Sequence, residues 1–324
     1  MIRLKDICAA SKRLKNVIHD TPLMYSHALS ELSDSNIYLK LENLQRTGSF
    51  KIRGAYNKIY KIRKHTKQVI AASAGNHAQG VALAAKILGL KATLVMPVGT
   101  PINKVLAVKK FEAEVILNGN NFDESLKFAQ GIEKKSNVSF INAFDDVDVI
   151  CGQGTIGLEI ANQLKDVDTV LVPVGGGGLI SGVAVALKEL NPKISIIGVE
   201  AKNAASMSVS LKKKKIVEPK NTKTIADGIA VIRVGDITFD ITQKYVDDVI
   251  VVSENEIEDA LMILVSKKRI IVEGAGAVGL SGLLKRKNRF KNKNTAIIIS
   301  GGNIDINVLN KIIDRGLQKE GRIV

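Results

Sequence analysis

Short segments that are apolar at consecutive positions alternate along the chain with longer amphipathic segments. Residues 92–96 and 169–173 lack the every-second-residue alternation of a half-exposed strand. Strands of this kind are typical of parallel sheets, which are covered on both faces. Between such segments, apolar or small residues recur at Ile52, Ala55, Tyr56, Ile59 and Ile62, the spacing of a helix with one buried face. The pattern predicts an α/β architecture.

Several of the predicted strands end in turns of small residues. The segment 69–80 reads as a strand, a turn and the start of a helix that ends at Gly89. Its turn offers backbone N–H groups at a helix N-terminus, together with the side chains of Ser73 and Asn76. Such a turn suits a carboxylate.

Two later segments repeat this arrangement of strand and glycine turn. The strand at 169–173 leads into Gly175–Gly178, and four successive glycines can fold into a nest of N–H donors for a phosphate dianion. The apolar run from Thr295 brings Ser300 to a glycine turn. Phosphate binding is therefore a candidate function of this chain.

Lys51 is the candidate nucleophile. The helical spacing from Ile52 places it in a first turn, with Ser49 predicted as the N-cap residue. The positive end of the helix dipole and burial both disfavour a charged ammonium there. A neutral lysine amine is what Schiff-base chemistry requires. Alone, Lys51 could equally be one of many surface cations, since the chain has 47 Lys and Arg residues.

Taken together, these segments resemble the fold-type-II pyridoxal-phosphate enzymes, in the threonine dehydratase and serine racemase branch. The resemblance covers nearly the whole chain. Besides the segments above, it includes residues 17–23, 152–160, 226–228, 246–254, 273–277 and Asp305.

The resemblance implies a tryptophan synthase β-like fold of two three-layer α/β domains with mostly parallel sheets. Residues 1–54 and 145–324 would form a large cofactor-binding domain, and residues 55–144 a small one. The cofactor, pyridoxal 5'-phosphate, would lie between them.

The resemblance also assigns roles to residues. Lys51 matches the lysine that binds the cofactor covalently and later moves the substrate's α-proton. Phe50 matches a residue beside the cofactor ring, and Asn76 the one that hydrogen-bonds its 3-hydroxyl. The phosphate would be held by Gly175, Gly176, Gly177, Gly178 and Leu179. Ser300 would meet the pyridine nitrogen.

The same comparison predicts the substrate site and the reaction. The substrate carboxylate would bind the loop of Ser73, Ala74, Gly75, Asn76 and His77. Asp227 matches a residue near the substrate hydroxyl, although it could instead cap a turn, and Glu273 an acid near the ring. The expected reaction converts L-threonine to 2-oxobutanoate and ammonia, and L-serine to pyruvate.

Two departures from the family pattern refine this expectation. Racemases resemble this chain but have a serine at the position of Ala74, where a methyl group cannot deliver a proton, so dehydration is favoured over the alternative of a serine racemase. Some relatives bind a divalent cation through residues matching Glu200 and Ala204 and a carboxylate where this chain has Ser206. One carboxylate instead of two binds a hard cation more weakly, so we expect no essential metal.

Other functional classes receive less support. An NAD-linked oxidoreductase would need glycine or alanine to close a dinucleotide fingerprint, but the closing positions counted from Gly175 and Gly176 are Ile180 and Ser181. A non-catalytic cofactor-binding protein is disfavoured by the presence of Lys51 and Ser300. The formal charge of +15 is spread along the chain, which has no Trp and no nucleic-acid motif, so no nucleic-acid partner is expected.

The sequence also allows predictions about the cysteines, a membrane partner, the cellular location and the oligomeric state. Cys8 and Cys151 are expected to be small residues in or near the core and not a disulfide framework. No apolar run reaches the length of a membrane span, so no membrane partner is expected. The expected location is the cytoplasm. The resemblance implies a homodimer or homotetramer.

Overall fold

The computed structural model describes residues 2–135, 137–219, 222–319 and 321. Its strands form two sheets, with order β1-β2-β10-β7-β8-β9 in the larger and β5-β4-β3-β6 in the smaller. All neighbouring strands are parallel except the antiparallel pair β1–β2 at one edge. The predicted α/β class with mostly parallel sheets is confirmed.

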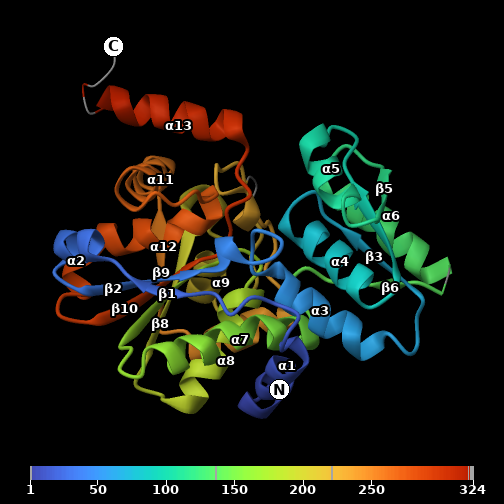
Figure 1. The fold of residues 1–324 in the computed structure, drawn as a ribbon, viewed down its shortest axis with the longest axis horizontal. Helices are drawn as coiled ribbons and strands as arrows, with labels where there is room; N and C mark the ends of the chain where they lie inside the picture. Colours follow the sequence, from blue (N-terminus) through green and yellow to red (C-terminus); the bar gives the residue numbers. More distant parts are fainter. Residues whose placement is uncertain (1, 136, 220–221, 320, 322–324) are drawn as a thin grey trace.

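The larger sheet has helices on both faces (Figure 1). Helix α12 packs on one face with α11 and α13 beyond it, and α7 and α8 lie on the other face. The strands are β1 (Leu23–Tyr25), β2 (Asn36–Leu41), β7 (Thr169–Pro173), β8 (Ser195–Ala201), β9 (Asp248–Val252) and β10 (Asn294–Ile299). The helices are α1 (Leu4–Leu14), α2 (His27–Ser33), α7 (Val147–Gln163), α8 (Gly178–Leu190), α9 (Ser206–Lys213), α10 (Asp236–Tyr245), α11 (Glu254–Lys268), α12 (Gly274–Lys285) and α13 (Ile306–Lys319), with 3-10 turns η1 (Glu42–Leu44), η2 (Lys202–Ala204), η3 (Asp227–Ile229) and η4 (Lys287–Arg289).

The smaller sheet is built from residues in the first half of the chain. Its strands are β3 (Gln68–Ala72), β4 (Lys91–Met96), β5 (Glu114–Leu117) and β6 (Ser139–Phe140). Helices α4 (Asn76–Ile87) and α5 (Ile102–Lys109) cover one face, and α6 (Phe122–Lys135) covers the other. Every position of β7 is buried, as are all but the first of β4, which explains their continuous apolar pattern.

Helix α3 (Lys51–Ile62) lies between the two sheets (Figure 1). Its apolar residues Ile52, Ala55 and Ile59 belong to the core of the smaller sheet, while its first turn contacts α7 beneath the larger sheet. Each sheet together with the helices that cover it is here called a unit, the larger unit and the smaller unit. Because α3 runs without interruption through residue 54, it connects the two units directly. The division of the chain into domains at residues 54/55 and 144/145 stays a prediction.

Two further findings bear on the expectations from sequence. Cys8 and Cys151 are free, with Cys151 buried among α1 and α8 residues. Within the described ranges, none of the helices combines the length and the apolar character that crossing a bilayer requires.

Glycines allow α7 to approach its neighbouring helices closely. A Cβ atom on Gly182 of α8 would lie 2.3 Å from the Ile150 carbonyl oxygen of α7, and one on Gly152 of α7 would lie 2.5 Å from the Arg53 carbonyl oxygen of α3. Both contacts are with backbone atoms, which cannot move aside like a flexible side chain. These crossings set the distances between α3, α7 and α8.

Substitution of Gly182 by Ala is expected to force α7 and α8 apart and to lower the free energy of unfolding by about 2–3 kcal/mol. Gly131 of α6 is the matched control, because a Cβ there meets nothing within 4 Å. Gly131→Ala should stabilise by about 0.5–1 kcal/mol through the better helix propensity of alanine. Urea unfolding of both variants measures the difference, and equal effects would contradict tight packing at Gly182.

Candidate active site

The carboxyl ends of β3, β7 and β10 border one cavity between the two sheets, the usual position of ligand sites in open α/β folds. All nine of the predicted cofactor-binding residues line it. They are Phe50, Lys51, Asn76, Gly175, Gly176, Gly177, Gly178, Leu179 and Ser300. Residues 50 and 300 are adjacent through the hydrogen bond from the Phe50 N–H to the Ser300 carbonyl oxygen, 3.1 Å.

Lys51 is the first residue of α3, and its amine faces the cavity. Its Nζ donates a hydrogen bond to the Ala143 carbonyl oxygen at 2.9 Å. Removal from water lowers the pKa of Lys51 from 10.5 to about 8, although the carboxylate of Glu273 opposes this shift. A substantial fraction of the amine is therefore neutral near pH 8. The direction agrees with the sequence prediction, and its main cause is burial.

The prediction that Ser49 caps α3 is wrong. The N-cap residue is Phe50, and the buried Ser49 hydroxyl has no hydrogen-bond partner among the described residues. The first turn is held differently, since the Arg53 N–H donates to the Phe50 carbonyl and the Gly54 N–H donates to Oε1 of Gln153, 3.1 Å away on α7. A capping residue can be suggested by residue type, but the long-range contact to Gln153 depends on how α3 packs against α7.

The tetraglycine loop forms a cradle of N–H groups at the start of α8. Among the described residues, none accepts a hydrogen bond from the N–H groups of residues 175 to 179. Gly177 has φ +95°, and a Cβ on Gly176 would lie 2.4 Å from the Phe144 ring. Five unpaired donors at a helix N-terminus attract an anion.

Asn76, Glu273 and Asn303 form a chain of hydrogen bonds across the cavity. The Asn76 Nδ2 donates to Oε1 of Glu273 at 2.6 Å, and the Asn303 Nδ2 donates to Oδ1 of Asn76 at 2.8 Å. Burial, with the nearby negative charge of Asp227, raises the pKa of Glu273 to about 7. The Asn76 amide therefore has a fixed orientation, with its second N–H available to a ligand.

The loop predicted to bind the substrate carboxylate borders the cavity at only one residue. Of Ser73, Ala74, Gly75, Asn76 and His77, Asn76 alone is among the cavity-lining residues. The hydroxyl of Ser73 accepts from the Gly75 N–H at 3.2 Å, and the N–H groups of Asn76 and His77 have no acceptor within the described part of the chain. They lie at the N-terminus of α4, a favourable place for a carboxylate.

His77 is part of the scaffold in this structure. Its Nε2 donates to the Ile141 carbonyl oxygen at 2.9 Å. Burial and the positive charge of Lys51 lower the pKa of His77 to about 3, so its ring is neutral at physiological pH. It does not supply a positive charge to the substrate loop.

Asp227 lies outside the cavity lining, although the neighbouring Gly228 is part of it. Its side chain is largely exposed and forms an ion pair with Lys104 of α5, 3.0 Å. This contact links the larger and smaller units. Its predicted place near the substrate hydroxyl stays a prediction.

Glu200 is buried and accepts hydrogen bonds from the N–H groups of Met207 and Ser208, at 2.8 and 2.7 Å. It therefore anchors the start of α9, while burial raises its pKa to about 8. Ala204 is buried, and Ser206 donates its hydroxyl proton to the Val231 carbonyl oxygen. No group of three or more His, Cys, Asp or Glu side chains in the described ranges is placed to hold a metal ion.

Sequence reasoning missed some residues of the site. Phe144 and Gln153 line the cavity. Phe144 lies outside the segments that carry the resemblance, and Gln153 lies in the segment 152–160 but had no role assigned to it. A cluster of charged side chains behind Lys51 was also missed. The sequence did contain a signal for this cluster. The charged residue Lys40 lies within a largely apolar strand, and Glu42 follows directly after its end.

Comparisons with known proteins identify the family of this chain. A family model described as "Pyridoxal-phosphate dependent enzyme" matches residues 14–301. The chain belongs to this family.

Two relatives are enzymes that act on L-threonine. An L-threonine ammonia-lyase from Thermotoga maritima is 52% identical over the whole of this chain and 81% of its own length. The catabolic L-threonine dehydratase TdcB from Escherichia coli is 44% identical over 96% of both chains. Threonine deaminase isoform 2 from Solanum lycopersicum superposes with a TM-score of 0.92 at 42% identity, covering 96% of this chain and 91% of that one. Maize serine racemase superposes with a TM-score of 0.91 at 35% identity, covering 98% and 99%.

The residues present fit pyridoxal 5'-phosphate, the cofactor of this family. The unpaired N–H groups of residues 175 to 179 match a phosphate, and any side chain at Gly176 would close the cradle against Phe144. The amine of Lys51 matches the aldehyde, and the hydroxyl of Ser300 is a neutral partner for a ring nitrogen.

The pKa of Lys51 predicts how the protein without cofactor captures pyridoxal 5'-phosphate. The rate of capture should rise with pH and level off above about 8, because the neutral amine is the reacting form. Stopped-flow absorbance measures this rate. Free Nα-acetyl-lysine is the control for the titration of pyridoxal 5'-phosphate itself. A midpoint near 10.5, as for the free amine, would contradict the burial argument.

Proposed function

We propose that this protein is a pyridoxal-phosphate-dependent L-threonine ammonia-lyase. It would convert L-threonine to 2-oxobutanoate and ammonia, and L-serine to pyruvate and ammonia. The observation that carries the proposal is a lysine amine with a lowered pKa in one cavity with a phosphate cradle and Ser300. It occurs in a chain that is 52% identical over its full length to an L-threonine ammonia-lyase.

The bound cofactor supplies an electron sink for the negative charge left when the substrate's α-proton is removed. Lys51 would hold the cofactor through Nζ, and the same Nζ, when it is free, would accept the substrate's α-proton. Its lowered pKa allows both steps, because a nucleophile and a base must each have a free electron pair. The proton held on Nζ is then available to the leaving β-hydroxyl.

The groups at the two ends of the ring influence its electronics. Ser300 presents a neutral hydroxyl, which does not hold a ring nitrogen protonated as an aspartate would. Asn76, oriented by Glu273 and Asn303, would present its second N–H to the phenolic oxygen of the cofactor. A weaker electron sink favours prompt loss of the β-hydroxyl over long-lived negative charge at Cα.

The N-terminus of α4 is the proposed binding place of the substrate carboxylate, through the N–H groups of Asn76 and His77. Ala74 lies in the same turn, and its methyl group cannot donate a proton to the face opposite Lys51. Elimination of the β-hydroxyl is therefore the expected outcome, and racemisation is not.

Other features of the protein belong to the same proposal. We propose a large domain of residues 1–54 and 145–324 and a small domain of residues 55–144. The cytoplasmic location and the assembly into a homodimer or homotetramer stay predictions.

Purified protein loaded with pyridoxal phosphate should release 2-oxobutanoate from L-threonine. Lys51→Ala should reduce this release by at least about a thousandfold, because both the covalent attachment and the proton acceptor are lost. Lys61→Ala is the control, since Lys61 lies on the same helix but is half-exposed and pairs with Asp148. A lactate-dehydrogenase-coupled assay measures the rates, and full activity of Lys51→Ala would refute the assignment.

Ala74→Ser should add measurable interconversion of L- and D-serine to the dehydratase activity, because the hydroxyl can donate a proton on the second face. Chiral chromatography of the remaining serine detects it. Ala72→Ser, on the strand just before this turn, is the control. Equal racemisation by the unchanged protein and by Ala74→Ser would show that position 74 does not decide the outcome.

A further inference from the structure

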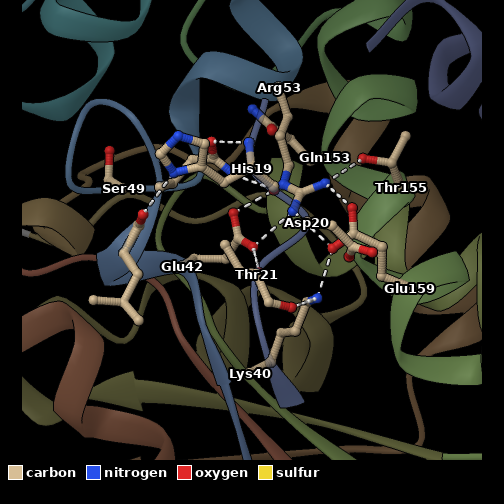
Figure 2. Close-up of polar contacts among 12 residues, drawn as sticks. His19, Asp20, Thr21, Lys40, Glu42, Ser49, Arg53, Gln153, Thr155 and Glu159 are labelled. Atoms are coloured by element: carbon tan, nitrogen blue, oxygen red, sulfur yellow. Dashed lines mark hydrogen bonds and ion pairs between the residues drawn. The ribbon is translucent and has the colours of Figure 1, made fainter. Parts of the chain in front are cut away.

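The guanidinium of Arg53 is fully buried and bound by two carboxylates (Figure 2). Its Nε and Nη2 donate to Glu42 at 2.8 and 2.7 Å, and its Nη1 and Nη2 donate to Glu159 at 2.5 and 2.9 Å. Nη1 also donates to the Thr155 hydroxyl at 3.1 Å. Two such forked contacts fix both the position and the plane of the guanidinium.

Lys40 completes the cluster. Its side chain is fully buried, and its Nζ lies 2.6 Å from Oε2 of Glu159 and donates to the Thr21 carbonyl oxygen at 2.6 Å. The Thr21 hydroxyl in turn donates to Glu42 at 2.5 Å. The four charged side chains, Lys40, Glu42, Arg53 and Glu159, are here called the ion cluster. Two positive and two negative charges make it neutral overall.

The ion cluster connects α3 to the larger unit alone. Lys40 and Glu42 come from β2 and η1, and Glu159 comes from α7. The tetraglycine loop and Ser300 belong to the same unit. The apolar residues of α3 pack instead in the core of the smaller unit. The contacts of Arg53 therefore tie the end of α3 that carries Lys51 to the unit that carries the phosphate cradle.

The geometry of a helix places Arg53 behind Lys51. Residues two apart on an α-helix project about 200° from each other, so Arg53 points into the ion cluster when Lys51 points into the cavity. A terminal residue such as Lys51 lacks the hydrogen bonds that hold a helix interior. Ser49 does not compensate, because its hydroxyl makes no hydrogen bond to the first turn.

Stability alone is a weak explanation for these four charges. Burying ions costs desolvation energy, and apolar side chains of similar volume often give equal or greater stability. What an apolar contact does not provide is the directional geometry of forked hydrogen bonds.

We propose that Arg53, bound by Glu42 and Glu159, is a positioning residue that holds Lys51 in register with the phosphate cradle and Ser300. The ion cluster fixes the rotation and axial position of the first turn of α3. The proposal rests on the cofactor-binding role proposed for Lys51.

Arg53→Lys tests the proposal, because lysine keeps the positive charge but lacks the planar guanidinium that forms paired hydrogen bonds with two carboxylates. We expect capture of pyridoxal phosphate to be at least tenfold slower than in the unchanged protein. The kcat for L-threonine, per bound cofactor, should also fall at least tenfold. KM should change less than threefold, since the α4 turn is untouched. A merely structural role would reduce the folded fraction but leave kcat per bound cofactor unchanged.

Glu258→Gln is the matched control. Glu258 is a buried acid that binds an arginine on another helix, Arg315, at 2.7 Å and lies on α11 away from the cavity. Capture and kcat of this variant should stay within twofold of the unchanged protein. A tenfold loss in the control would overturn the specific role of the ion cluster.

The remaining outcomes are equally decisive. A folded Arg53→Lys with less than a tenfold loss in capture or kcat overturns the proposal. If that variant does not fold, Glu159→Gln is measured against the same thresholds, and failure of both to fold overturns the proposal in favour of a purely stabilising cluster. Failure of the unchanged protein to capture cofactor would instead refute the proposed function, so the two failures are distinguishable.

Discussion

The close approach of α3 to α7 is the constraint on which the rest of the site depends. A Cβ on Gly152 would lie 2.5 Å from the Arg53 carbonyl, and a Cβ on Gly54 would lie 2.3 Å from Nε2 of Gln153. At this distance Gln153 of α7 accepts a hydrogen bond from the Gly54 N–H, and the carboxylate of Glu159, also on α7, meets Arg53. The helix that joins the two units is thereby fixed at the end that carries Lys51.

The electrostatics of the cavity follow from this arrangement. Backbone N–H groups at the start of α8 border it and have no acceptor among the residues that the structure describes, and the start of α4 presents others beside it. Burial lowers the pKa of the Lys51 amine in this cavity to about 8, so more of it is neutral than of an exposed lysine. Unpaired donors next to a partly neutral amine favour a ligand with an anionic group and an electrophilic carbon. The positive ends of two helices also stabilise carboxylate and phosphate without requiring a charged side chain.

The periodicity of apolar residues was sufficient to locate the helices and strands that surround the site. The segment predicted from Ile52 to Ile62 is the body of α3, and residues 169–173 are β7. The glycine-rich turns identified the cradle because their chemistry is local. Ser49 was misjudged as a cap because residue type indicates only a capacity to accept a hydrogen bond. Glu200 shows the same limit of judging by residue type. It is buried and anchors the start of α9 by accepting hydrogen bonds from backbone N–H groups seven and eight positions later in the chain.

The sequence by itself determined the α/β class and the parallel strands, and it predicted the candidate site residues whose surroundings are local: Lys51 at a helix start, Asn76 after a strand, and Gly175–Gly178. Hydrophobic periodicity and backbone freedom are properties of short segments, so a short segment reveals them. The tertiary structure alone decided that Glu273 orients Asn76, that Lys104 pairs with Asp227, and that Arg53 lies between Glu42 and Glu159. Each of these contacts joins residues from distant parts of the chain. Their energies depend on burial and on distances of a few ångström, which exist only after the helices and sheets have packed.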